Sequence, residues 1–302
     1  MNEKEPLNYP RRDDDRAAIP SSQINVEVGA LSVKGSRYEK NEDHYMVARF
    51  ERSRQTLLTN ISPAFLTPFS SEIGYALIVA DGIGQRNSGE IASKEAISYL
   101  VQLAEQTPDW ILTLEADYSK QVLSRMRHRF NEISRHFEAC ANRDRSLAGM
   151  GSTITLAASI GRNLIIGHIG DTRCYLLRGR ALVKLTRDQT FTQALMDAGT
   201  FDSKFVQTHP MRDTLTGIIE TDGEFQPAQL NHHRLMEGDQ LLLCSDGLTD
   251  IVDESQMLSI LSESGSADLA CRVLIQHALT AGCTDDATAI VCRYSNMSAP
   301  SI

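Results

Sequence analysis

The order of the hydrophobic patterns along the chain constrains its fold more than any other feature. Apolar residues that alternate with a period of two are typical of strands, and those that recur every three or four positions are typical of amphipathic helices. The expected strands lie at 24–33, 44–50, 75–80, 152–160, 163–170, 173–178, 181–185, 240–244 and 287–294. The expected helices lie at 88–106, 118–143, 193–199 and 266–282. Because two helices follow one another and most strands are consecutive, we predict an α+β fold of mostly antiparallel sheet.

The chain of 302 residues shows no change of composition that would require two domains. We therefore predict one domain at 23–294, with polar, mobile tails at 1–22 and 295–302. Residues 51–73 are rich in Ser, Thr and Pro and are expected to form a loop or an insertion.

Composition excludes several classes of partner. The net charge of −9 argues against a nucleic-acid-binding protein, which needs a concentrated basic face. The chain has neither an apolar run long enough to span a membrane nor a signal-peptide core at its start, so we expect a cytoplasmic protein. Separately, we expect it to act as a monomer. The six cysteines show no C-x-x-C spacing and no partnered histidine pattern, which predicts reduced, buried thiols rather than a disulfide or zinc framework.

Acidic residues recur where the expected strands begin or end. They are Asp81, Asp171 and Asp246 at strand exits, and Glu42, Asp43, Asp285 and Asp286 just before strand starts. Carboxylates that gather in space repel one another unless a cation neutralises them, and oxygen ligands on rigid supports suit Mg²⁺ or Mn²⁺ rather than Zn²⁺. The pattern indicates a metal site if these strand ends are neighbours.

A plain turn is the competing interpretation of each Asp-Gly pair, because Asp and Gly are common turn residues. Asp222-Gly223 lies in a hydrophilic stretch and is interpreted as such a turn. Gly238-Asp239 is expected only to open the following strand. The strand-exit context sets Asp81, Asp171 and Asp246 apart from these two pairs.

Eight motifs, in order, together resemble the type 2C family of metal-dependent serine/threonine protein phosphatases, in its compact bacterial form. They are 35–43 (GSRYEKNED), 76–93 (ALIVADGIGQRNSGEIAS), 149–158 (GMGSTITLAA), 169–178 (IGDTRCYLLR), 185–190 (LTRDQT), 209–216 (HPMRDTLT), 241–250 (LLLCSDGLTD) and 282–291 (GCTDDATAIV). The resemblance covers about residues 24–294. It implies a four-layer α/β/β/α sandwich of two antiparallel sheets flanked by helices, with the metals at one end.

The resemblance also implies roles for individual residues. Asp81 would bridge two Mn²⁺ or Mg²⁺ ions, with Asp246 and Asp285 completing one and the Gly82 carbonyl serving the other. A third ion would use Asp171 and Asp246, with Asp250 as a further candidate ligand. Glu42 and Asp43 would hold metal-bound waters, Arg37 would clamp the phosphate, and residues 186–229 would form a flap near the metals.

These roles imply hydrolysis of phosphoserine and phosphothreonine in proteins, opposing a serine/threonine kinase. A metal-activated water would attack the phosphoryl group without a covalent intermediate. The sequence departs from the family pattern at Arg37, which stands four residues before Asn41 where the family usually has two, and at Ile83, Gln85, Gln189 and Asp286. Asp286 replaces the usual Asn and adds charge beside the site.

Two other functions compete with this hypothesis. A catalytically silent binding module would keep the fold without the chemistry, but the complete set of expected metal carboxylates argues against it. A metal hydrolase of small phosphoesters would use the same centre, and the sequence leaves that alternative open.

Overall fold

The computed structural model describes residues 21–52, 57–62, 72–85, 88–106, 118–199, 210–211, 214–221 and 228–297. The predicted N-terminal tail up to residue 20, the end of the C-terminal tail from 298, the Asp222-Gly223 turn, most of 51–73 and part of the 186–229 flap lie outside the described residues.

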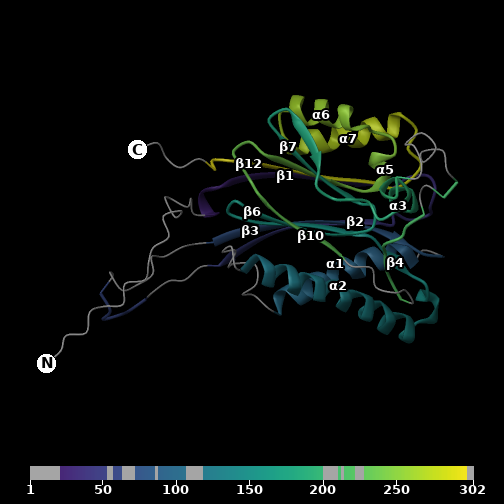
Figure 1. Ribbon diagram of the computed structural model, residues 1–302, viewed down its shortest axis with the longest axis horizontal. Coiled ribbons are helices and arrows are strands. Elements are labelled where there is room, and N and C mark those ends of the chain that lie inside the picture. The colour runs from purple at the N-terminus through teal and green to yellow at the C-terminus, as the bar shows by residue number, and fades with distance from the viewer. Residues whose placement is uncertain are drawn as a thin grey trace.

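Two antiparallel sheets form the centre of the fold (Figure 1). The strands of the five-stranded sheet are, in spatial order, β1 (Asn25–Val33), β12 (Ala287–Ser295), β11 (Gln240–Cys244), β7 (Arg173–Arg178) and β8 (Ala181–Lys184). Those of the seven-stranded sheet are β10 (Gln229–Arg234), β6 (Asn163–Ile169), β5 (Ile154–Ile160), β3 (Glu72–Ile83), β4 (Gly151–Ser152) and β9 (Ile219–Glu220), with β2 (Asp43–Arg52) paired to β3.

Helices cover the outer face of each sheet (Figure 1). The seven-stranded sheet carries α1 (Ser88–Glu105) and α2 (Tyr118–Arg143), and the five-stranded sheet carries α6 (Glu254–Glu263) and α7 (Ala267–Thr280). Short helices are α3 (Phe191–Asp197), α5 (Asp246–Thr249) and the 3₁₀ turns η1 (Ser21–Gln23) and η4 (Arg145–Leu147). The predicted four-layer sandwich is thus confirmed.

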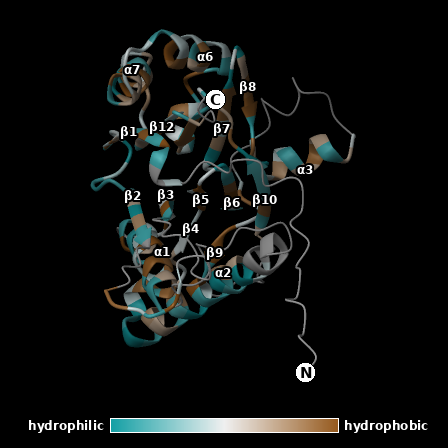
Figure 2. Cartoon of the chain, turned by 90° about the vertical axis from the view of Figure 1, so that its left-hand side faces the viewer, coloured by the Kyte–Doolittle hydropathy of each residue, from teal (hydrophilic) through white to brown (hydrophobic). Residues whose placement is uncertain are grey.

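Three apolar cores lie between the four layers of the sandwich. Because side chains alternate along a strand, one strand contributes residues to two of these cores. In β3, Leu77 and Val79 face the other sheet, whereas Ile78 and Ala80 face α1 and α2. The outer layer beneath α6 and α7 includes Leu242. Figure 2 shows hydrophobic residues, in brown, alternating with hydrophilic ones on the helices and strands. Among the described residues, no helix is long and apolar enough to cross a membrane.

Helix α6 and strand β10 are the longest of the elements that the sequence interpretation missed. Helix α6 begins at a capping box in which Asp253 and Gln256 satisfy each other's backbone N–H groups. Strand β10 carries His232 and His233. The sequence interpretation had placed no strand here, because the segment has no apolar alternation, but β10 forms by pairing with β6.

Candidate metal centre

Asp81 and Asp43 face each other across the β2–β3 pair. The Thr153 N–H donates to the Asp81 carbonyl at 2.9 Å, and the Asp81 N–H donates to Thr153 Oγ1 at 3.2 Å. The expected strand end at Asp81 is wrong, since β3 continues to Ile83 through pairing with β4. Asp81 is therefore held inside a strand, which fixes its backbone more firmly than an exit loop would.

Asp246 and Asp285 lie at neighbouring strand ends because β11 and β12 are antiparallel partners. Asp246 directly follows β11 as the first residue of α5, and Asp285 shortly precedes β12. The two turns pack closely, since a Cβ on Gly247 would lie 2.0 Å from the Asp286 carbonyl oxygen. The sandwich thus brings together carboxylates that are far apart in sequence, at the end where Figure 1 shows α5 and β4.

Asp43 links the two sheets through hydrogen bonds. Its Oδ2 accepts from Ser245 Oγ at 2.6 Å and from Thr288 Oγ1 at 2.7 Å, and its side chain is almost completely buried. Ser245 directly precedes Asp246, so these bonds fix Asp43 next to that residue. The sequence interpretation missed Ser245 and Thr288, because a hydroxyl beside a strand end carries no distinctive signal.

Glu42 lies at the N-terminus of α1. Its carboxylate lies against the first turn of that helix at Gly89, and its carbonyl accepts from Ser93 Oγ at 2.5 Å. Helix N-termini favour such anions. Burial, together with the charges of Asp286 and Asp285, nevertheless raises the pKa of Glu42 above its ordinary value.

Burial and mutual repulsion raise the pKa values of the central acids. Burial is the largest cause for Asp81, followed by the charges of Asp246 and Asp43 and then of Asp171 and Asp285; the pKa of Asp81 lies well above its ordinary value. Burial, then Asp171 and Asp285, act in the same way on the pKa of Asp246. Each carboxylate is thus destabilised by the others, as expected for groups that a cation neutralises.

Asp171 follows β6 and is buried. Burial first, and the charge of Asp188 second, raise its pKa to about 7. Its Oδ1 atom is buried without a hydrogen-bond partner among the described residues. Asp250 is exposed at the end of α5, and its charge contributes to the raised pKa values of Asp171 and Asp246.

The residues fit hard divalent cations by donor chemistry. The cluster offers carboxylate oxygens with raised pKa values, an unpartnered buried oxygen on Asp171, and a glycine carbonyl at Gly82. Among the described residues, no three of these acids have ligand oxygens that all lie within 4.8 Å of one another.

We expect the free energy of unfolding of the protein, freed of metal ions by a chelator, to fall as pH rises from about 4 to about 7. The folded-state pKa of Asp171 lies above the ordinary value of 3.8, so in this window the folded chain holds a proton that the unfolded chain has lost. This contribution is complete below the unfolded pKa and is lost as pH passes the folded one. Melting temperatures measured across this range should show a smaller fall for Asp171→Asn, and an equal fall in that variant would contradict the assignment.

Arg37 reaches the acidic cluster despite its departure from the family spacing. Its Nη1 lies 2.7 Å from Asp285 Oδ2, and its side chain remains 59% exposed. The N–H groups of Ser36 and Arg37 donate to the Thr284 carbonyl, each at 2.9 Å. The loop is therefore attached to the segment that carries Asp285.

Asp286 fastens the same loop at two further points. Its Oδ1 accepts from the Gly35 N–H at 2.7 Å and its Oδ2 from the Glu42 N–H at 2.6 Å, and the side chain is 4% exposed. The carboxylate that replaces the usual Asn therefore spans both ends of the segment that carries Arg37.

We expect Asp286→Ala to lower kcat/KM by roughly 10- to 100-fold, because two buried N–H groups lose their acceptors and the loop loosens. Hydrolysis of an aryl phosphate, the activity that the resemblance implies, would measure the change. Asp268→Ala is the matched control, since Asp268 is an exposed aspartate of α7 paired with Arg272. Equal kinetics in both variants would contradict the role of Asp286.

Gln189 connects the Asp171 turn to the part of the flap that is described. Its Oε1 accepts from the Gly170 N–H at 2.9 Å, and its backbone carbonyl accepts from the Thr216 N–H at 2.8 Å. A Cβ on Gly217 would lie 1.9 Å from Gln189 Oε1. Gln189, a departure from the family pattern, thus positions both segments.

Comparisons with known proteins identify the family. The family model of protein phosphatase 2C matches residues 64–282. The serine/threonine protein phosphatase PstP of Mycobacterium tuberculosis is 35% identical over 215 residues, which are 71% of this chain and 39% of PstP. The serine/threonine phosphatase stp of Listeria welshimeri is 30% identical over 227 residues, which are 73% of this chain and 85% of that protein. The match thus spans about two fifths of PstP and most of the Listeria protein.

Solved structures agree with this result. The M. tuberculosis phosphatase PstP/Ppp superposes with a TM-score of 0.70 at 28% identity, covering 90% of this chain and 99% of that one. The catalytic domain of PstP in complex with two manganese ions gives a TM-score of 0.69 at 25% identity, covering 90% of this chain and all of the other. The predicted resemblance is confirmed, and the chain belongs to the protein phosphatase 2C family, whose members named here are bacterial serine/threonine phosphatases.

Proposed function

We propose that this protein is a Mn²⁺- or Mg²⁺-dependent phosphatase that hydrolyses phosphoserine and phosphothreonine in proteins. The observation that carries this proposal is the convergence of Asp81, Asp246 and Asp285, from three separate segments, with burial and mutual repulsion raising the pKa values of the first two. The relative with two manganese ions supports the choice of metal.

The proposed ligands of the two principal ions are Asp81, the Gly82 carbonyl, Asp246 and Asp285. A third ion would use Asp171 and Asp246, with Asp250 as a further candidate. Bound cations would supply the activation of a water nucleophile and the neutralisation of phosphoryl charge. The proposed ligands have only oxygen donors, which is the donor set that Mg²⁺ and Mn²⁺ prefer.

The chain's own side chains would orient the reactants around these ions. Glu42, held by the α1 N-terminus, and Asp43, held by Ser245 and Thr288, are fixed acceptors suited to orienting waters. Arg37 would exchange Asp285 for the phosphoryl oxygens of the substrate, which a guanidinium can bind in pairs. Ile83 cannot donate a proton, so the leaving serine or threonine oxygen would take one from water.

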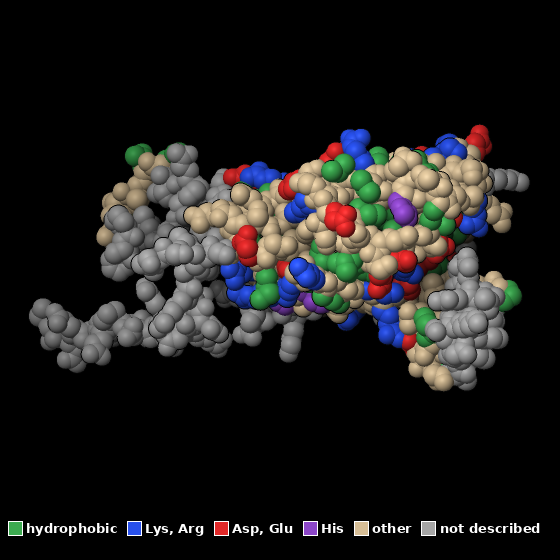
Figure 3. Space-filling model, turned by 90° about the horizontal axis from the view of Figure 1, so that it is seen from above, with side chains coloured by type: hydrophobic (Ala, Val, Ile, Leu, Met, Phe, Trp, Pro, Cys, Tyr) green, Lys and Arg blue, Asp and Glu red, His purple; other side chains and the backbone are tan. Residues whose placement is uncertain are grey.

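The proposed substrates are phosphorylated proteins, on which the enzyme would oppose a serine/threonine kinase. We further propose that the protein is a monomer in the cytoplasm. All six cysteines are free, which supports a reducing compartment. On the face seen in Figure 3, basic and acidic side chains are interspersed, which offers no concentrated basic surface there for nucleic acid.

The test is hydrolysis of a phosphothreonine peptide and of an aryl phosphate, with Mn²⁺ and then with excess chelator. We expect both activities to require Mn²⁺ and the peptide to have the higher kcat/KM. Activity that survives chelation, or the absence of Mn²⁺-dependent activity, would contradict the proposal. Hydrolysis of the aryl phosphate alone would support the small-phosphoester alternative.

A further inference from the structure

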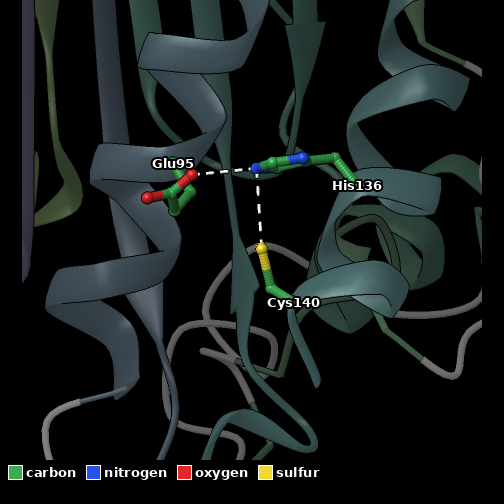
Figure 4. Close-up of side chains that lie close together, drawn as sticks. All are labelled: Glu95, His136 and Cys140. Carbon is green, nitrogen blue, oxygen red and sulfur yellow. Dashed lines mark hydrogen bonds and ion pairs between the residues drawn. The ribbon is translucent and has the colours of Figure 1, made fainter. Parts of the chain in front are cut away.

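Three side chains of different chemistry meet between α1 and α2, outside the acidic cluster (Figure 4). Glu95 projects from α1, and His136 and Cys140 project from α2 one helical turn apart. Their ligand atoms all lie within 4.8 Å of one another, which no other group of three such residues achieves in the described part of the chain. The sequence interpretation expected no zinc framework, because it found neither C-x-x-C spacing nor a partnered histidine pattern.

Both neighbours of His136 approach the same ring nitrogen. Its Nε2 lies 2.8 Å from Glu95 Oε2 and 3.6 Å from Cys140 Sγ. A Cys-His-acid relay would place the thiol and the carboxylate on opposite ring nitrogens, because the ring passes a proton from one to the other. Convergence on a single nitrogen instead places three potential ligand atoms around one point.

We propose that Glu95, His136 and Cys140 form a binding site for Zn²⁺ or a similar transition-metal ion. Nitrogen, sulfur and carboxylate oxygen are the donors that zinc uses in proteins. This site differs in donor type from the all-oxygen acidic cluster, and the inference does not depend on the proposed function.

The distances suit a tetrahedral ion. With zinc bonds of about 2.0 to 2.3 Å, bound nitrogen and sulfur lie about 3.6 Å apart, and bound nitrogen and oxygen about 3.3 Å apart. The His136–Cys140 separation already has the first value. The Glu95 carboxylate would have to withdraw by about 0.5 Å, which its partly exposed side chain allows.

The surroundings fix the ring and leave the site accessible. Tyr99 stacks on His136 with ring centroids 4.1 Å apart and an interplanar angle of 8°. Cys140 is buried, whereas the side chains of His136 and Glu95 are 19% and 34% exposed, so an ion and a fourth ligand such as water can reach the site. Arg143 Nη2 lies 3.4 Å from Cys140 Sγ. Its charge opposes a cation there, and Arg143→Ala should therefore bind the ion more tightly.

The test is a Co²⁺ titration of the full chain, stripped of metal and reduced, because Co²⁺ bound to thiolate gives a charge-transfer absorption that oxygen ligands do not. We expect one thiolate-bound Co²⁺ per chain, displaced by Zn²⁺. Cys140→Ser should remove the band, and His136→Gln should weaken binding by on the order of 100-fold or more.

Two controls separate this site from the other cysteines and from the acidic cluster. Cys283→Ser removes the thiol that is partly exposed, the other five being buried, and Asp246→Asn removes a proposed ligand of the catalytic ions; both should keep the band. A band that persists in folded Cys140→Ser, verified by circular dichroism, would overturn the proposal. Wild-type protein that shows no band would also overturn it, leaving only a hydrogen-bonded contact between helices.

Discussion

Asp246→Asn is expected to lower phosphatase kcat/KM by at least on the order of a thousandfold. Asn keeps the shape of the side chain but loses the negative charge that two cations would share, and preorganised electrostatic groups of this kind contribute most to catalysis. The assay is hydrolysis of an aryl phosphate at saturating Mn²⁺.

The fold should survive this change. The backbone bond from the Asp250 N–H to the Asp246 carbonyl, at 2.8 Å, does not involve the side chain. Repulsion and burial already destabilise the Asp246 carboxylate, so metal-free Asp246→Asn should melt no lower than metal-free wild type. Asp268→Asn, at an exposed position on α7, is the matched control and should stay within about twofold of wild type. Near-wild-type turnover of Asp246→Asn would refute the ligand assignment.

Gly82→Ala is expected to destabilise the protein by about 1–3 kcal/mol or more and to remove most activity. A Cβ at this position would lie 1.9 Å from the Gly89 carbonyl oxygen and 3.0 Å from that of Glu42. Both atoms belong to backbone, so β3 and the first turn of α1 would have to separate. The carboxylate of Glu42, which lies over Gly89, would then lose its position.

Chemical denaturation and the Mn²⁺-dependent assay would measure the two effects of Gly82→Ala. Gly265→Ala is the matched control, because a Cβ there would meet no described atom within 4 Å and its backbone is not left-handed. Wild-type stability in Gly82→Ala would show that α1 does not constrain this part of β3.

Periodicity predicted the elements whose own residues decide their structure. The expected helix at 118–143 coincides with α2. Gly161 and Gly179, which stand between consecutive expected strands, have the left-handed backbone that favours glycine. The expected strand at 163–170 coincides with β6, in which His168 is fully buried. These features follow from local pattern and local turn chemistry.

Tertiary partners decide the features that the sequence interpretation missed. Strand β10 has the polar sequence QLNHHR and exists because β6 pairs with it. Asp81 lies within β3 rather than at its end because β4 extends the pairing. Helix α6 did carry a local signal, in the spacing of Asp253 and Gln256, that could have been recognised.

The candidate site likewise contains carboxylates that the sequence predicted and contacts between them that it did not. Strand-end acids and ordered motifs indicated which carboxylates gather, because antiparallel strand ends meet at one edge of a sandwich. The bonds that fix them, from Ser245 and Thr288 to Asp43 and from Asp286 to the Arg37 loop, join residues more than 200 positions apart. No pattern within one segment reports such contacts.

Anomalous diffraction at the manganese edge, from crystals grown with Mn²⁺, tests the central claim most directly. The account predicts two strong peaks that share Asp81, one also bound by Asp246 and Asp285 and the other by the Gly82 carbonyl. Manganese bound elsewhere, with Asp81 and Asp246 sharing no ion, would contradict it.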